Sequence, residues 1–189
     1  MLNTLAGIIA SSGGAAAAAN DYESIATVTV GSGGSASVTF SSIPATYQHL
    51  QIRALVRDDR AAAINNMTFR VNGDTGANYT QHALYGDGSS VGAFGNASTN
   101  LTYGGFIPSA SATASVFGVT VIDILDYANT SKYKTFRVLS GFDANGSGGV
   151  RLYSGLWMST SAMTSITFDS ETAGDFVQYS SFALYGIKG

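Results

Sequence analysis

The sequence predicts an all-β chain, an antiparallel β-sandwich of jelly-roll-like character that carries a short apolar N-terminal arm. From Tyr22 onward, apolar and polar residues alternate in short runs, as they do in strands that bury one face. Turn signals such as Asn72-Gly73 and Asn145-Gly146 separate these runs. Because no run of comparable length has a helical period, residues 21–189 are expected to form a single sandwich domain.

Residues 1–20 differ in composition from the rest of the chain, and their apolar residues fall at helical spacing. The residues of this stripe are Leu2, Leu5, Ile8 and Ile9. A helix of about two turns is marginal by itself and needs a surface to pack on. We therefore expect a docking arm that binds a neighbouring protein; the alternative is a tail that covers its own domain. A signal peptide is not expected, because no Lys or Arg precedes the apolar stretch.

The first alternating runs, residues 24–30 and 35–40, flank the glycine-rich segment 31–34. Such a segment can reverse the chain, so the two runs predict a β-hairpin. Residues 47–57 alternate again and predict a half-buried strand with Arg57 on its solvent-facing side.

Eight further strands are expected along the rest of the chain. They are predicted at residues 66–71, 79–85, 101–106, 116–125, 134–142, 149–158, 165–168 and 176–187. Residues 79–86 (YTQHALYG) resemble residues 179–186 (YSSFALYG), which predicts two strands in equivalent environments. Trp157 ends an apolar strand and is expected in the core.

The composition indicates a polar surface with few charges. Charged residues make up 11% of the chain, against about 25% in an average protein. Such a surface is expected either to be covered by neighbours in an assembly or to face neutral carbohydrate. A net charge of -3 and a pI near 5.1 argue against a nucleic-acid partner. No apolar run reaches the length of about 20 residues that crosses a membrane, so no membrane partner is expected.

Clustered charges are interpreted as solvated. Arg53, Arg57 and Arg60 surround Asp58 and Asp59, which predicts a balanced network on the surface.

Few residues offer catalytic chemistry, and we expect a protein that is not an enzyme. The only histidines, His49 and His82, stand alone in predicted strands, and no Gly-x-Ser-x-Gly elbow or phosphate-binding loop occurs. Residues 143–148 alternate Asp, Asn and Ser as calcium loops do, but the closing bidentate acid is absent, so a hairpin turn is predicted. No metal and no cofactor are expected. A glycan depolymerase stays a remote third possibility that paired carboxylates in a cleft would revive.

Three stretches carry a resemblance to a known group of proteins. Residues 24–34 (SIATVTVGSGG), 40–53 (FSSIPATYQHLQIR) and 182–189 (FALYGIKG) resemble uncharacterised structural proteins encoded by tailed bacteriophages. The similarity extends from about Tyr22 to the C-terminus. The resemblance implies a β-sandwich component of a virion, either a head decoration or a tail or fibre part, and it supplies no catalytic residue.

The expected function is therefore structural. Our first expectation is a capsid decoration or cement protein, located in the virion, whose arm docks on the major capsid protein or on neighbouring tail proteins. We expect a homo-oligomer, with a trimer favoured. The alternative is a tail-fibre, tail-tip or baseplate protein that binds host glycan. In that case loop aromatics would make the contact, namely Tyr85, Phe94 and Tyr103, with residues 86–100 as the binding loop.

Overall fold

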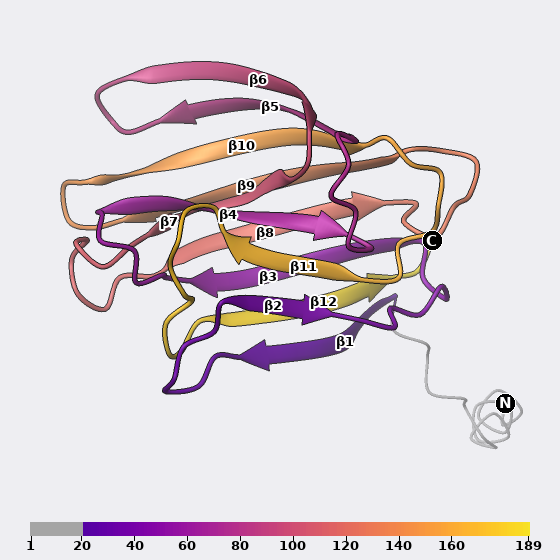
Figure 1. The fold of residues 1–189 in the computed structure, drawn as a ribbon, viewed down its shortest axis with the longest axis horizontal. Helices are drawn as coiled ribbons and strands as arrows, with labels where there is room; N and C mark the ends of the chain where they lie inside the picture. Colours follow the sequence, from indigo (N-terminus) through magenta and orange to yellow (C-terminus); the bar gives the residue numbers. More distant parts are fainter. Residues whose placement is uncertain (1–20) are drawn as a thin grey trace, which may run out of the picture.

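The computed structural model describes residues 21–189, which form two antiparallel sheets packed face to face (Figure 1). The twelve strands are β1 (Tyr22–Thr29), β2 (Ser37–Phe40), β3 (His49–Val56), β4 (Ile64–Val71), β5 (Tyr79–Gly86), β6 (Val91–Thr99), β7 (Thr102–Pro108), β8 (Gly118–Leu125), β9 (Lys134–Asp143), β10 (Gly148–Trp157), β11 (Ile166–Ser170) and β12 (Ser181–Ile187). The predicted antiparallel β-sandwich is confirmed. The arm predicted for residues 1–20 lies outside the described residues.

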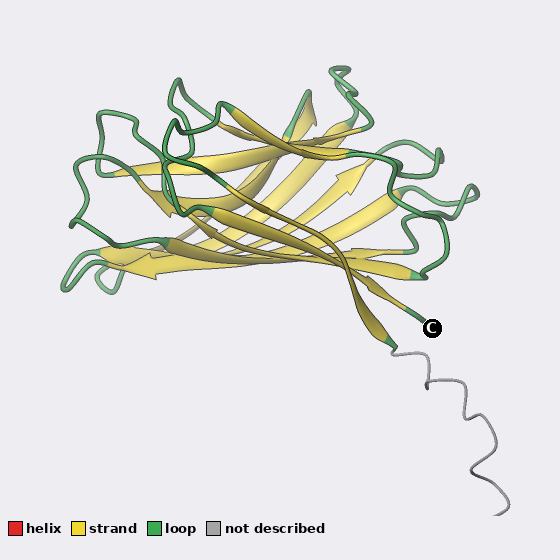
Figure 2. Ribbon diagram, turned by 90° about the horizontal axis from the view of Figure 1, so that it is seen from below, coloured by secondary structure: helices red, strands yellow, loops and turns green. Residues whose placement is uncertain are grey.

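The two sheets differ in size, and the smaller covers only part of the larger (Figure 2). The large sheet has eight strands in the order β1-β12-β3-β8-β9-β10-β5-β6, and the small sheet has four in the order β2-β11-β4-β7. Within residues 21–189 there is no helix long and apolar enough to cross a membrane.

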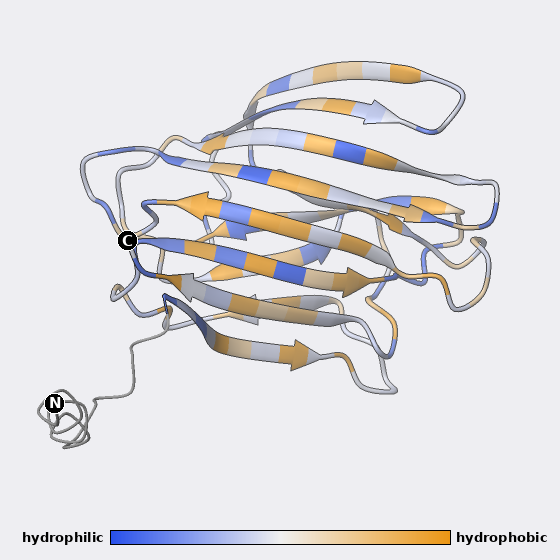
Figure 3. Cartoon of the chain, turned by 180° about the vertical axis from the view of Figure 1, so that it is seen from behind, coloured by the Kyte–Doolittle hydropathy of each residue, from blue (hydrophilic) through white to orange (hydrophobic). Residues whose placement is uncertain are grey.

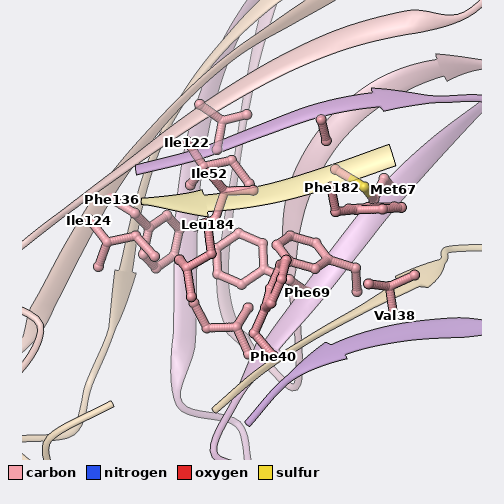
Figure 4. Packing of buried hydrophobic residues seen from close by; sticks show 14 of the residues in the cluster. Val38, Phe40, Ile52, Met67, Phe69, Ile122, Ile124, Phe136, Phe182 and Leu184 are labelled. Carbon is pink, nitrogen blue, oxygen red and sulfur yellow. The ribbon is translucent and has the colours of Figure 1, made fainter. Parts of the chain in front are cut away.

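The core lies between the sheets and is built from the inward-facing member of each alternating pair (Figure 4). Phe69 of β4 lies at its centre. The Phe69 ring centroid is 5.0 Å from that of Phe136 in the large sheet and 5.8 Å from that of Phe168 in its own sheet. Phe168 in turn lies 5.5 Å from Phe182 of β12. Aromatic rings therefore join the two sheets across the middle of the molecule, and edge-on contacts of this kind add to the burial of apolar area.

Trp157 lies in the core, as predicted, with 3% of its surface exposed. Its indole Nε1 donates a 2.7 Å hydrogen bond to Oδ2 of Asp74, so the buried polar atom has a partner. That hydrogen bond, together with those from Asn78 and the Gly76 amide, holds the pKa of the Asp74 carboxyl below its usual range. The predicted turn at Asn145-Gly146 is also confirmed, because it joins the paired strands β9 and β10.

The predicted hairpin between residues 24–30 and 35–40 is wrong. β1 pairs with β12 in the large sheet, whereas β2 pairs with β11 in the small sheet. The turn at 31–34 therefore carries the chain from one sheet to the other. The reason is that the C-terminal strands β11 and β12 make the same crossing alongside and offer each run a partner of its own.

The predicted surface network of arginine and aspartate is wrong for two of its members. Arg57 is buried, and its Nη1 and Nη2 atoms donate to backbone carbonyls between Ala110 and Val116 at 2.8–3.2 Å. Asp58 is fully buried, and its Oδ2 accepts hydrogen bonds from Asn65 and Ser170. Backbone carbonyls thus accept from the Arg57 guanidinium, and uncharged donors serve one oxygen of Asp58, whereas its Oδ1 has no hydrogen-bond partner among the described residues. A sequence pattern does not reveal such partners.

The two similar octapeptides do not occupy equivalent environments. They form β5 and β12, each next to an edge of the large sheet. Their faces are reversed, however, because Leu84 is 61% exposed whereas Leu184 is 1% exposed. In a strand, a shift of one residue exchanges the buried and the exposed face. The repeat therefore has no structural counterpart.

Candidate functional site

Figure 3 shows the large sheet from behind, with hydrophobic residues along its strands. Leucines and valines of this sheet occupy outward positions where solvent-facing strands usually carry polar residues, and several of them are exposed. These residues are Leu55, Leu84, Val91, Val119, Val121, Leu139, Val150 and Leu152, and we call them the outer apolar face. They come from β3, β8, β9, β10, β5 and β6, which are neighbours in the sheet. Strand register places them in two adjacent cross-strand rows.

The first row runs from β3 to the sheet edge at β6. Leu55 pairs with Val119, and Val150 and Val91 continue the row, with glycines of β9 and β5 between them. Val91, on the edge strand, is 91% exposed. Because the intervening glycines add no side chain, the valines stand clear of their neighbours and remain accessible.

The second row is fully aliphatic across four strands. Val121 pairs with Leu139, Leu139 with Leu152, and Leu152 with Leu84. The last three are 55%, 47% and 61% exposed, respectively. Directly opposite residues on neighbouring strands have their side chains in contact on one face of a sheet. The four residues therefore form one continuous stripe.

A polar row limits the outer apolar face on one side. The next outward positions along the same strands are Asp123, Arg137, Ser154 and His82, again paired in register. The change from aliphatic to polar therefore occurs within two residues on each strand. An exposed apolar patch with a polar border is typical of a surface that binds another molecule.

The outer apolar face is hollowed where two hairpin turns rise above it. A hollow of about 790 Å³ has Val119, Val121, Leu139 and Val150 on its floor. Its rim is formed by the turn after β5 and by the turn between β9 and β10. A second hollow of about 600 Å³ adjoins it and is lined by Leu84, Leu152 and residues of β6. Volumes of this size accommodate several aliphatic side chains of a bound partner.

Sequence reasoning did not single out the outer apolar face, although a signal was present. The runs Gly118–Leu125 and Gly148–Trp157 have apolar residues in both phases of the alternation. That pattern is usual in strands covered on both faces, but the described residues cover only one face here.

The three aromatics predicted as glycan contacts do lie together, but the expected loop does not exist. Residues 86–100 form a short turn and strand β6, so Tyr85, Phe94 and Tyr103 are strand residues of β5, β6 and β7. The ring centroid of Phe94 is 6.3 Å from that of Tyr85 and 6.0 Å from that of Tyr103. The prediction missed β6 because Gly92, Ala93 and Gly95 interrupt its alternation of apolar and polar side chains.

These rings form an aromatic cluster with Tyr153 on the inward side of the large sheet. Tyr153 is 1% exposed, and its ring centroid lies 5.8 Å from that of Tyr103. Tyr85 is 39% exposed and lies across Gly92, where an added Cβ would be 2.4 Å from the ring. The cluster thus anchors the β5–β6 hairpin to β7 and β10, and Tyr85 is the most exposed of its four rings.

A polar network borders the aromatic cluster. The phenol of Tyr103 donates a 2.6 Å hydrogen bond to Oε1 of Glu171, and Asn66 donates one of the same length to Oε2. Arg151 donates to Oδ1 of Asn66 at 2.9 Å and lies over the Tyr85 ring at 5.6 Å. Burial and the hydrogen bond to Glu171 raise the pKa of the Tyr103 phenol, which therefore remains a donor at neutral pH.

The remaining candidates for chemistry stand apart. His49 is in β3 and His82 in β5, with three strands between them. His49 accepts a hydrogen bond from the backbone of Asp126, whose carboxylate pairs with Lys132 at 2.7 Å. Among residues 21–189, no three His, Cys, Asp or Glu side chains gather into a group that could hold a metal ion.

Comparison of the chain with family models, with curated proteins and with solved structures finds no match. The arm residues predicted to dock, Leu2, Leu5, Ile8 and Ile9, lie outside the described residues. The outer apolar face and the aromatic cluster are therefore the two candidate binding surfaces of the described residues.

Proposed function

We propose that this chain is a non-enzymatic structural subunit of a bacteriophage virion, most specifically a capsid decoration or cement protein. The outer apolar face is the observation that carries the proposal. A surface that presents adjoining aliphatic rows to solvent on a chain with 11% charged residues is well suited to permanent burial in an assembly. The resemblance of residues 24–34, 40–53 and 182–189 to tailed-phage structural proteins supports the virion as that assembly.

The chemistry of the outer apolar face indicates the kind of partner. The central part of a stable protein interface is depleted of charge and rich in apolar side chains, with a polar rim. Leu139 and Leu152 lie at such a centre, and Arg137 and Asp123 lie in the bordering row. The partner is therefore an uncharged, apolar patch on the major capsid protein, on a neighbouring tail protein or on another copy in a homo-oligomer.

Copy number in purified particles tests the head-decoration role. We expect tens to hundreds of copies of this chain per virion, measured by quantitative mass spectrometry against the major capsid protein. The same ratio is expected in isolated tailless heads. A few copies per virion, lost together with the tails, would reject decoration and place the chain in the tail.

The second candidate function is glycan binding at a tail fibre, tail tip or baseplate, and the exposed Tyr85 ring favours it. Tyrosine combines a flat apolar face with a polar tip, and Asn66, Arg151 and Glu171 place hydrogen-bonding groups nearby. This arrangement can stack on one face of a sugar ring and orient its hydroxyl groups.

If Tyr85 binds glycan, Tyr85→Ala is expected to weaken binding of the purified chain to host cell-surface glycan about tenfold, since one lost stacking contact corresponds to about 1.4 kcal/mol. Titration of the glycan by calorimetry measures this change. Tyr179→Ala is the matched control, because Tyr179 is 68% exposed and lies outside the aromatic cluster. Equal affinities of the two variants would exclude Tyr85 as the contact.

A further inference from the structure

We propose that the chain's own N-terminal segment, residues 1–10, binds in the hollow of the outer apolar face and covers it until the chain is assembled. The inference concerns the isolated protein and does not depend on the virion role. The chain has few charges, and exposed leucines such as those of β9 and β10 favour non-specific association with other proteins. A bound N-terminal segment would prevent this association.

The segment and the hollow have matching chemistry. Residues 1–20 contain no Asp, Glu, Lys, Arg or His, and their large apolar residues are confined to the first half. The floor of the hollow is aliphatic, formed by Val119, Val121, Leu139 and Val150, and its polar groups, among them Asp87 and Asp143, belong to the turns and strand ends around it. Burying aliphatic side chains against this floor removes apolar area from water on both sides.

The chain is long enough for this contact. Glu23 of β1 lies in the same cross-strand row as Phe136 of β9, and Leu139 is three residues further along β9. Four strand spacings and three residues along the sheet separate Glu23 from Leu139, a distance of about 22 Å. The connecting residues 10–21 can span up to about 40 Å when extended.

The length of the linker, residues 11–20, favours binding of the segment to its own chain over binding to a second copy. Residues 11–20, with sequence SSGGAAAAAN, are rich in small residues. A linker of about 12 small residues has an average end-to-end distance of about 19 Å. A linker whose average length is close to the required span raises the local concentration of its segment into the millimolar range. The segment of the same chain therefore competes well against that of a second copy.

Engineered disulfides test the contact directly, because the chain contains no cysteine. Cysteine is placed at Thr4, Leu5 or Ala6 in turn, so that the result does not depend on one register, and each is combined with Leu139→Cys in the full-length protein. Dilute samples are oxidised and analysed by non-reducing electrophoresis and peptide mass spectrometry. We expect at least one pair to form an intramolecular disulfide in high yield, which requires Cα atoms within about 7 Å.

The matched control replaces Leu139→Cys with Thr135→Cys. Thr135 is exposed on the same face of the same strand, outside the hollow and closer to the row of Glu23. A segment that moves freely would react with Thr135→Cys at least as well, whereas a bound segment favours Leu139→Cys by about tenfold or more. Equal yields, or disulfide-linked dimers in place of the intramolecular product, would overturn the proposal. Circular dichroism of each variant verifies that the sandwich is folded.

Discussion

Replacing Leu84 and Leu152 together by aspartate is expected to remove this chain from assembled particles while leaving the domain folded. The two side chains are directly opposite each other in β5 and β10 and are 61% and 47% exposed. In the free domain, water hydrates the new carboxylates, so the cost in stability is limited to the repulsion between two opposite like charges. In an interface they would be buried without partners, which costs several kcal/mol. A cost of about 3 kcal/mol corresponds to a loss of about 100-fold in affinity.

The measurement is the ratio of this chain to the major capsid protein after variant and unmodified chains are added to particles that lack it. His82→Asp combined with Ser154→Asp is the matched control. His82 and Ser154 are paired on the same two strands as Leu84 and Leu152, and each lies two residues before or after the corresponding leucine. They are therefore on the same face of the sheet, and both are exposed. Both double variants gain the same number of carboxylates. If both bind particles equally well, the outer apolar face is not the docking surface.

The second large effect is expected in the core. Phe69→Ala should lower the free energy of unfolding by about 3–5 kcal/mol, because the ring is fully buried and its removal leaves a cavity between the sheets. Phe136 and Phe168 pack against this ring from opposite sheets. Their backbones are held in strand ladders, so the neighbouring rings cannot close the space.

Denaturant unfolding followed by circular dichroism measures the change. Phe69→Leu keeps most of the volume and is expected to cost less than about 1.5 kcal/mol. Tyr133→Ala removes an aromatic ring that is 52% exposed and should change stability by less than about 0.5 kcal/mol. A loss below 1 kcal/mol for Phe69→Ala would show that the joined aromatic rings do not hold the sheets together.

The sequence pattern predicted which residues face inward, since this property is local. Alternation along residues 47–57 predicted a half-buried strand, and Leu50 and Ile52 on its inward face are fully buried. Trp157 was likewise placed in the core correctly. A strand turns successive side chains to opposite faces whatever its neighbours are, so the pattern contains this information.

Where the prediction failed, a distant segment decided the outcome. Residues 35–40 follow residues 24–30 directly, yet the two runs pair with β11 and β12 in different sheets. Arg57 was assigned to solvent by its phase, but backbone carbonyls from residues 110–116 surround its guanidinium group. Neither partner can be identified from the local sequence.

The candidate sites were likewise predicted only in part. Tyr85, Phe94 and Tyr103 were chosen as aromatics that could act together, and the structure brings them together from three strands. Their setting in a hairpin rather than a loop was missed. The outer apolar face was not predicted at all, because an outward valine or leucine on one strand is unremarkable by itself.

The sequence by itself therefore determined the fold class, the half-buried alternation of strands such as residues 47–57 and the position of turns such as Asn145-Gly146. Only the tertiary structure decided the order and register of the strands. That order aligns Val121, Leu139, Leu152 and Leu84 into one stripe, although β10 and β5 are far apart in the chain. The physical reason is that alternation specifies the face of a side chain, whereas its neighbours on that face are set by hydrogen-bonded pairing between distant segments.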